Sequence, residues 1–118
     1  RVRLTIIGSG YQRREIEETA KRIGRSQDVV IIDELPREEV LAVVERSDIF
    51  LFPSLREGGS WSLMEAMAIG LPVICLDWAG MAIITDDNCA IRLPVSNRTD
   101  AKGYGCCHYY TDKKSRIT

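Results

Sequence analysis

Apolar residues gather in five short runs along the first 95 residues of the chain. These runs are Val2–Ile7, Val29–Ile32, Ile49–Phe52, Val73–Leu76 and Cys89–Leu93. Short, mostly apolar runs of this kind are typical of buried strands. Helical patterns separate the first four runs, so the chain alternates between strand and helix. This alternation predicts an α/β fold with a Rossmann-like parallel sheet and helices on both faces.

The polar and apolar spacing between these runs places the helices. We predict helices over Tyr11–Ile23, from Pro36 to Ser47, and from the loop at Ser60 to Gly70, with one turn at Met81–Ile84. Gly24 and Gly70 are natural residues to end helices, and Pro36 favours the first helical position. Val29–Ile32 is β-branched throughout, which predicts a strand that is covered on both sides.

One stretch, from Phe52 to Ile74, organises the rest of the chain. It combines a strand end, a glycine loop, a helix that either Ser60 or Ser62 can cap, and another buried strand. The start of a helix favours an anion, and loops at the carboxyl ends of parallel strands bind ligands. Two carboxylates, Glu57 and Glu65, flank this position. Acceptor groups beside an anion site suit a ligand that carries both phosphates and hydroxyls, such as a sugar nucleotide.

The residues alone leave two roles open for Glu65 and for Trp61. Ser62 and Glu65 have the spacing of a capping box, in which Glu65 bonds back to the Ser62 amide. Small neighbours in an apolar helix favour instead a ligand-binding Glu65. Trp61 is either a cover of the core or a wall of the ligand cleft, and its size predicts partial burial.

A second glycine turn, Gly8-Ser9-Gly10, follows the first predicted strand. Together with Asp33 about 20 residues further on, it resembles the dinucleotide-binding pattern, in which the acid binds a ribose. Arg13 stands where the third glycine of that pattern is expected. An NAD-type binder that uses Gly8, Gly10 and Asp33 is therefore an alternative to a simple strand-to-helix turn.

Composition and charge narrow the class of function. The chain has 118 residues, 45% of them hydrophobic, and a net charge of −1, which does not favour a nucleic-acid-binding surface. No apolar run reaches the roughly 20 residues of a membrane span. The four cysteines do not form a secreted disulfide pattern, so we expect a reducing, cytoplasmic setting. Cys89, Cys106, Cys107 and His108 lack the spacing of a zinc site, and we expect no metal.

The stretch from Pro53 to Ile74 carries a family resemblance. Its matching residues are Pro53-Ser54, Glu57-Gly58, Glu65-Ala66-Met67-Ala68, Gly70 and Pro72-Val73-Ile74. With two glutamates separated by seven residues, this pattern resembles the carboxyl-terminal Rossmann domain of retaining GT-B glycosyltransferases, group one (family four). The flanking segments Leu4–Gly10 and Ser47–Leu51 also match, and the similarity covers roughly residues 2 to 95.

The resemblance implies roles for particular residues. Glu57 would be the catalytic-site acid that holds the hydroxyls of the donor sugar, and Glu65 would bind the ribose. The remaining donor-binding positions would be Gly10, Glu34, Leu35, Gly58, Gly59, Ser60, Trp61 and Ser62. The implied reaction moves a sugar from a nucleotide diphosphate sugar to an acceptor hydroxyl with retained configuration. The substrate is the nucleotide sugar, and no cofactor is expected.

The resemblance also indicates missing parts. We expect residues 1–95 to be an incomplete nucleotide-sugar-binding domain, a truncated half of a GT-B fold, and residues 96–118 to be an irregular tail. From the resemblance we expect the family's diphosphate-binding Arg and Lys and its amino-terminal acceptor domain to precede the segment given by this chain. A further alternative is a non-catalytic interaction module, whose exposed sheet edge pairs with another copy, as a homo-oligomer, or with a missing domain.

Overall fold

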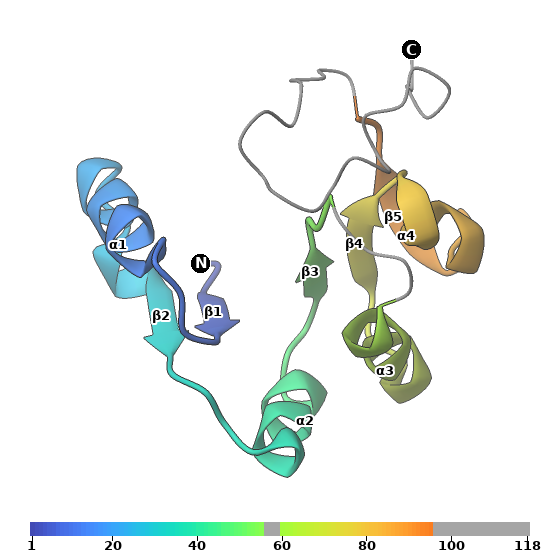
Figure 1. The fold of residues 1–118 in the computed structure, drawn as a ribbon, viewed down its shortest axis with the longest axis horizontal. Helices are drawn as coiled ribbons and strands as arrows, with labels where there is room; N and C mark the ends of the chain where they lie inside the picture. Colours follow the sequence, from blue (N-terminus) through green and yellow to red (C-terminus); the bar gives the residue numbers. More distant parts are fainter. Residues whose placement is uncertain (56–59, 96–118) are drawn as a thin grey trace. The chain divides into compact units, whose positions relative to one another are not determined.

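The computed structural model describes residues 1–55 and 60–95. These residues form two compact units, one comprising Arg1–Arg46 and one beginning at Ser47. Both contain parallel strands with helices packed on them (Figure 1). No helix in the described ranges has both the length and the apolar character required to cross a membrane.

The first unit contains a two-stranded parallel sheet. Its elements are β1 (Leu4–Ile7), α1 (Arg13–Arg22), the 3-10 helix η1 (Ser26–Asp28), β2 (Val29–Ile32) and α2 (Arg37–Glu45). Leu4 pairs with Val29 and Ile7 with Ile32, so the two strands are in register over their whole length. Helix α1 packs against β2, and its buried residue is Ala20.

Gly24 ends α1 as the sequence predicts. Its φ of 68° is left-handed, a conformation that glycine adopts without steric cost. The Gly24 amide donates to the Lys21 carbonyl (3.1 Å), and the Arg25 amide donates to the Ala20 carbonyl (2.7 Å). These two bonds form a Schellman motif, which turns the chain sharply into η1 and β2.

Two predictions about this unit are wrong in detail. Pro36 is the N-cap of α2 and not its first helical residue, with a ψ of 147° that is extended. Strand β2 is not covered on both sides, because Val30 is 38% exposed and the other three residues are half-buried. A strand made of β-branched residues is compatible with burial on both faces. Its sequence does not show whether other elements cover those faces.

The second unit contains a three-stranded parallel sheet. Its elements are β3 (Phe50–Phe52), α3 (Trp61–Ile69), β4 (Val73–Leu76), α4 (Ala79–Ile84) and β5 (Ala90–Leu93). Strand β4 lies between β3 and β5 (Figure 1), with Leu51 opposite Ile74 and Ile74 opposite Ile91. Helix α3 packs on β3 and β4, and α4 packs on β4.

The core of the second unit forms where the two helices meet β4. Its fully buried side chains are Leu63, Ala66, Val73, Cys75 and Met81. Val73 and Cys75 alternate along β4 with half-buried Ile74 and Leu76, so β4 has one well-covered face. Gly70, with a φ of 86°, ends α3 and leads the chain directly into this core.

The α/β, Rossmann-like class with parallel strands is confirmed, with one difference. A single sheet was expected, whereas the described strands form two sheets, β1-β2 and β3-β4-β5. Alternation of strand and helix fixes the direction of the strands, but it does not determine which strands are neighbours.

Candidate functional site

The start of α3 is fixed by a buried serine cap. Ser60 is 4% exposed and has an extended backbone, and its Oγ accepts the Leu63 amide at 3.2 Å. Its Oγ also lies 3.1 Å from the Ser62 Oγ. The cap satisfies one amide of the first turn, while the others have no partner inside the helix. The chain therefore presents backbone donors at a rigidly held helix start.

This geometry corrects the capping-box interpretation. Ser62 is the second residue of α3, and the capping serine is Ser60, whose partner amide belongs to Leu63. A capping box built on Ser62 and Glu65 is therefore wrong. Glu65 lies further along α3 and is half-buried. The ligand-binding role of this acid stays a prediction.

Trp61 is far more exposed than predicted. Its exposed fraction is 79%, although its neighbour Leu63 is completely buried. Residues two apart on a helix lie on nearly opposite sides, so the burial of Leu63 turns Trp61 toward solvent. Ser62 is also exposed. The indole stands beside the helix start and does not cover the core.

Two contacts that the sequence did not reveal join the loops around this helix. The Trp78 Nε1 donates to the Leu55 carbonyl at 2.9 Å, which connects the loop after β4 with the loop after β3. Arg92 on β5 donates to Asp77, which directly follows β4, at 3.1 Å. The sequence signal for these contacts was that Asp77 and Trp78 directly follow β4, but their partners depend on which strands are neighbours.

In the first unit, the glycine turn after β1 and the segment after β2 lie at the same edge of the sheet. The Gly8 amide donates to the Ile32 carbonyl at 2.9 Å, and Gly8 has a φ of 138° that favours glycine. The Ser9 hydroxyl donates to Glu34 Oε1 at 2.9 Å. The structure thus brings Gly10, which is exposed, to the same edge as Glu34 and half-buried Leu35.

Arg13 forms an ion-pair cluster at the start of α1. Its Nη1 contacts Asp33, and its Nε donates to Glu17 at 3.0 Å. The hydrogen bond that Arg13 donates to Glu17, with the nearby charge of Asp33, raises the pKa of the Arg13 guanidinium. The carboxylate of Asp33 is therefore already engaged by a cation of its own chain.

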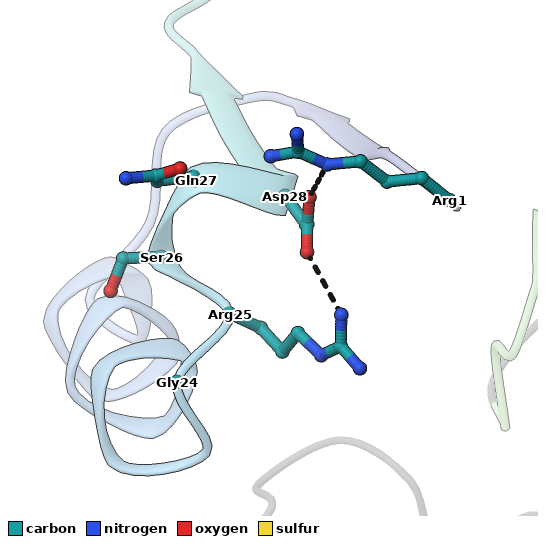
Figure 2. Close-up of a pocket in the computed structure, with 6 residues that line it drawn as sticks. All are labelled: Arg1, Gly24, Arg25, Ser26, Gln27 and Asp28. Carbon is teal, nitrogen blue, oxygen red and sulfur yellow. Dashed lines mark hydrogen bonds and ion pairs between the residues drawn. The ribbon is translucent and has the colours of Figure 1, made fainter.

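An open hollow of about 520 Å³ lies elsewhere in the first unit (Figure 2). Its lining residues are Arg1, Gly24, Arg25, Ser26, Gln27 and Asp28. They precede β1 and β2 and therefore lie at the amino ends of these strands. Parallel sheets bind ligands outside the carboxyl ends, so this hollow does not match the predicted site.

Two arginines converge on Asp28 in this hollow, as Figure 2 shows. Arg1 Nε lies 2.6 Å from Asp28 Oδ1, and Arg25 Nη1 lies 3.3 Å from Asp28 Oδ2. The hydrogen bond from Arg1, followed by that from Arg25, holds the pKa of Asp28 below its ordinary value.

We expect Asp28 to make the free energy of unfolding of the first unit depend on pH in the acid range. A carboxylate whose pKa is lowered by folding stabilises the folded chain above its unfolded pKa. This contribution falls as the pH drops through that value toward the lower folded pKa. Urea unfolding across the acid range should show a steeper loss of stability in the natural chain than in Asp28→Asn. Parallel pH profiles for the two chains would contradict this assignment.

The Ser60 cap gives a second measurable expectation. Ser60→Ala should lower the free energy of unfolding by about 0.5–2 kcal/mol, because the Leu63 amide loses its acceptor near the core. Ser62→Ala is the matched control, since Ser62 is exposed and the capping side chain of α3 is that of Ser60. Thermal unfolding followed by circular dichroism measures both. Equal losses in the two variants would show that the cap does not act as described.

Several predicted residues lie outside the described ranges. They are Glu57, Gly58 and Gly59 of the donor loop, and Cys106, Cys107 and His108 of the carboxyl-terminal segment. Within residues 1–55 and 60–95, no three His, Cys, Asp or Glu residues are grouped so that they could hold a metal ion.

The fold and the helix start define an α/β domain of the Rossmann-like class. The family model "Glycosyl transferases group 1" matches residues 1–105, and the chain belongs to this family. It is 37% identical over 91 residues to the amylovoran biosynthesis glycosyltransferase AmsK of Erwinia amylovora, covering 71% of the chain and 22% of that protein.

Two other relatives show the same pattern of partial coverage. A 2-deoxystreptamine glucosyltransferase of Streptomyces kanamyceticus is 33% identical over 76 residues, covering 64% of the chain and 20% of that protein. A D-inositol 3-phosphate glycosyltransferase of Corynebacterium urealyticum is 32% identical over 75 residues, covering 63% of the chain and 18% of that protein. The chain thus spans about a fifth of the length of these curated relatives.

Proposed function

We propose that this chain is the donor-binding, carboxyl-terminal part of a retaining GT-B glycosyltransferase. Its ligand would be a nucleotide diphosphate sugar, whose sugar is transferred to an acceptor hydroxyl. One observation carries the proposal most: in a member of the glycosyl transferases group 1 family, a buried serine fixes the start of α3 with Glu65 further along the same helix.

The diphosphate is the part of the ligand that the start of α3 suits best. The first-turn amides of Trp61 and Ser62 and the positive end of the helix dipole favour an anion. Negative charge grows on the diphosphate as the bond to the sugar breaks, so fixed donors at this position would stabilise the leaving group. Because Ser60 and Leu63 hold the turn rigidly, these donors need little reorganisation.

The two glutamates would divide the hydroxyl groups of the ligand between them. Glu65, half-buried on α3, would accept hydrogen bonds from the ribose. Glu57 would accept those of the donor sugar in the loop that precedes α3. A carboxylate only accepts hydrogen bonds at neutral pH, which suits hydroxyl donors and keeps both acids away from the phosphate oxygens.

The edge formed by Gly10, Glu34 and Leu35 would contact the nucleobase. Ser9 holds the Glu34 carboxylate at 2.9 Å, which fixes the segment after β2 beside the glycine turn. Because the side chain is held in this way, backbone groups of Glu34 and Leu35 are the contacts that we assign to the base.

An NAD-type nucleotide binder is the second candidate function. It would use the same edge of the first sheet, after β1 and β2. Such a protein requires an acid that binds the ribose hydroxyls, and Asp33 occupies that place in the sequence. Here Asp33 is paired with Arg13, the residue that replaces the third glycine. A ribose would have to displace this ion pair, which favours the nucleotide-sugar proposal.

The length of the relatives supports a role within a larger enzyme. An acceptor-binding domain and further diphosphate-binding cations would belong to the four-fifths of those proteins that the chain does not match. The isolated chain would then bind a nucleotide weakly and catalyse little. The free thiols of Cys75 and Cys89 support a reducing, cytoplasmic setting.

Amide shifts in a nuclear magnetic resonance titration test this proposal. UDP and GDP, added separately, should move the signals of Ser60, Trp61 and Ser62, and NAD at the same concentration should not. If NAD moves the signals of Gly8, Gly10 and Asp33 while neither diphosphate affects α3, the second candidate replaces the first. A titration in which no compound shifts any of these signals would also reject the proposal.

A further inference from the structure

The loop that follows β4 is bonded to a neighbouring segment on each side. On one side, Arg92 of β5 donates through its Nη1 to the Asp77 Oδ1 at 3.1 Å. On the other side, the Trp78 Nε1 donates to the Leu55 carbonyl at 2.9 Å. We name Leu55, Asp77, Trp78 and Arg92 the Trp78 anchor. All four residues belong to the second unit, so every contact of the anchor lies within that unit.

The backbone at the centre of the anchor is also bonded. The Asp77 amide donates to the Leu93 carbonyl of β5 at 2.9 Å, and the Trp78 amide donates to the Leu76 carbonyl at 2.9 Å. The next residue, Ala79, has a φ of 50°, a left-handed conformation that residues with a side chain rarely adopt. Such a conformation persists where the surrounding contacts determine it. The indole is therefore presented from a fixed position.

The hydrogen bond to Leu55 depends on the tryptophan side chain in particular. The indole Nε1–H is a donor only, and it is the sole polar group of this half-buried side chain. Its acceptor is a backbone carbonyl that follows β3. Phenylalanine at position 78 would retain an aromatic ring but could not make this bond.

The anchor lies at one end of the connection between β3 and α3. Four residues of the sequence separate Leu55 from Ser60, the buried cap of α3. Trp78 holds the first end of this connection, and the burial of Ser60 holds the second. Ligands of open α/β sheets bind outside the carboxyl ends of the strands, and both the anchor and the start of α3 follow such ends.

We propose that Trp78 is a positioning residue of the donor site, an inference that rests on the proposed function. Its indole N–H holds Leu55, so the connection that enters α3 is placed before the nucleotide diphosphate sugar binds. Ordering a segment during binding lowers affinity, and the anchor removes part of that cost. One hydrogen bond of ordinary strength corresponds to about a three- to tenfold change in affinity. Trp78 acts here through Leu55 and not by touching the ligand.

Hydrogen exchange of the two indole N–H groups tests the proposal in the natural chain. Trp61 is 79% exposed and serves as the reference without ligand. The Trp78 indole proton should exchange at least about fivefold more slowly than that of Trp61. Because coupling between two sites is reciprocal, saturation with UDP or GDP, whichever binds more tightly, should slow the Trp78 proton by a further factor of about three to ten. An unchanged Trp78 rate in the nucleotide-bound chain would overturn the proposal.

Trp78→Phe provides a second readout, because it removes the N–H and keeps an aromatic ring. Isothermal titration calorimetry below the unfolding transition should show a loss of affinity for the same nucleotide of about three- to tenfold. Ile84→Val is the matched control, since it reduces the packing of a half-buried residue of α4 outside the anchor. It should leave the affinity unchanged. A lower melting temperature of Trp78→Phe with unchanged affinity would show a structural role only and overturn the proposal.

These measurements separate this inference from the proposed function. Nucleotide-induced shifts at Trp61 and Ser62, with Trp78 exchange unaffected, would keep the donor site and reject the positioning role. If neither nucleotide affects α3, the donor site is rejected and the positioning role with it. Equal exchange of the two indole protons without ligand would reject the anchor whatever the nucleotides do.

Discussion

Leu63→Ala should lower the free energy of unfolding of the second unit by about 2–5 kcal/mol. Leu63 is completely buried between the start of α3 and β4, and its amide also donates to the capping Ser60. Truncation leaves a cavity in the core of this unit, to which the almost fully buried Val73 and Cys75 also belong. Urea unfolding followed by fluorescence would measure this loss, because Trp61 and Trp78 both lie in this unit.

Met64→Ala is the matched control for this experiment. Met64 is the next residue on the same helix but is 36% exposed, so its truncation should cost much less. The difference between the two losses depends on which face of α3 packs against the sheet. Similar losses in the two variants would contradict the packing of Leu63 that positions the candidate site.

Glu65→Gln should weaken the binding of a nucleoside diphosphate by about 10- to 100-fold. A hydrogen bond to a charged group contributes about 1.5–3 kcal/mol, and glutamine keeps the shape of the side chain without its charge. Isothermal titration calorimetry with UDP and GDP measures the change. If the acid serves the ligand, the melting temperature should stay close to that of the natural chain, because the N-cap of α3 is Ser60.

Glu39→Gln provides the control for the charge change alone. Glu39 is exposed in the first turn of α2 and is not among the proposed ligand contacts. It should leave nucleotide affinity unchanged. If Glu65→Gln lowers the melting temperature but not the affinity, the acid is structural and the donor-binding role of Glu65 is wrong.

The sequence predicted the local elements well, because local chemistry determines them. Strand β4 has the predicted limits, and Gly24 and Gly70 end their helices because both adopt left-handed backbone conformations. Ser60 was one of two predicted caps, and only the structure distinguishes it from Ser62. The choice depends on how α3 packs, since burial of Leu63 sets where the helix begins.

The sequence could not predict features that depend on which elements meet. The bond between Trp78 and the Leu55 carbonyl joins residues 23 positions apart, and the pair of Arg92 with Asp77 requires β4 and β5 to be neighbours. The exposure of Trp61 follows from the burial of Leu63 and contradicts an expectation that rested on side-chain size alone. In each case the outcome depends on tertiary contacts, which the local sequence pattern does not reveal.

A crystal structure of the chain with a nucleoside diphosphate sugar tests the central claim most directly. We predict that the diphosphate lies against the amides of Trp61 and Ser62, with the Glu65 carboxylate within hydrogen-bond distance of the ribose hydroxyls. A ligand that occupies the hollow around Asp28, or that displaces Arg13 from Asp33 without touching α3, would contradict the account.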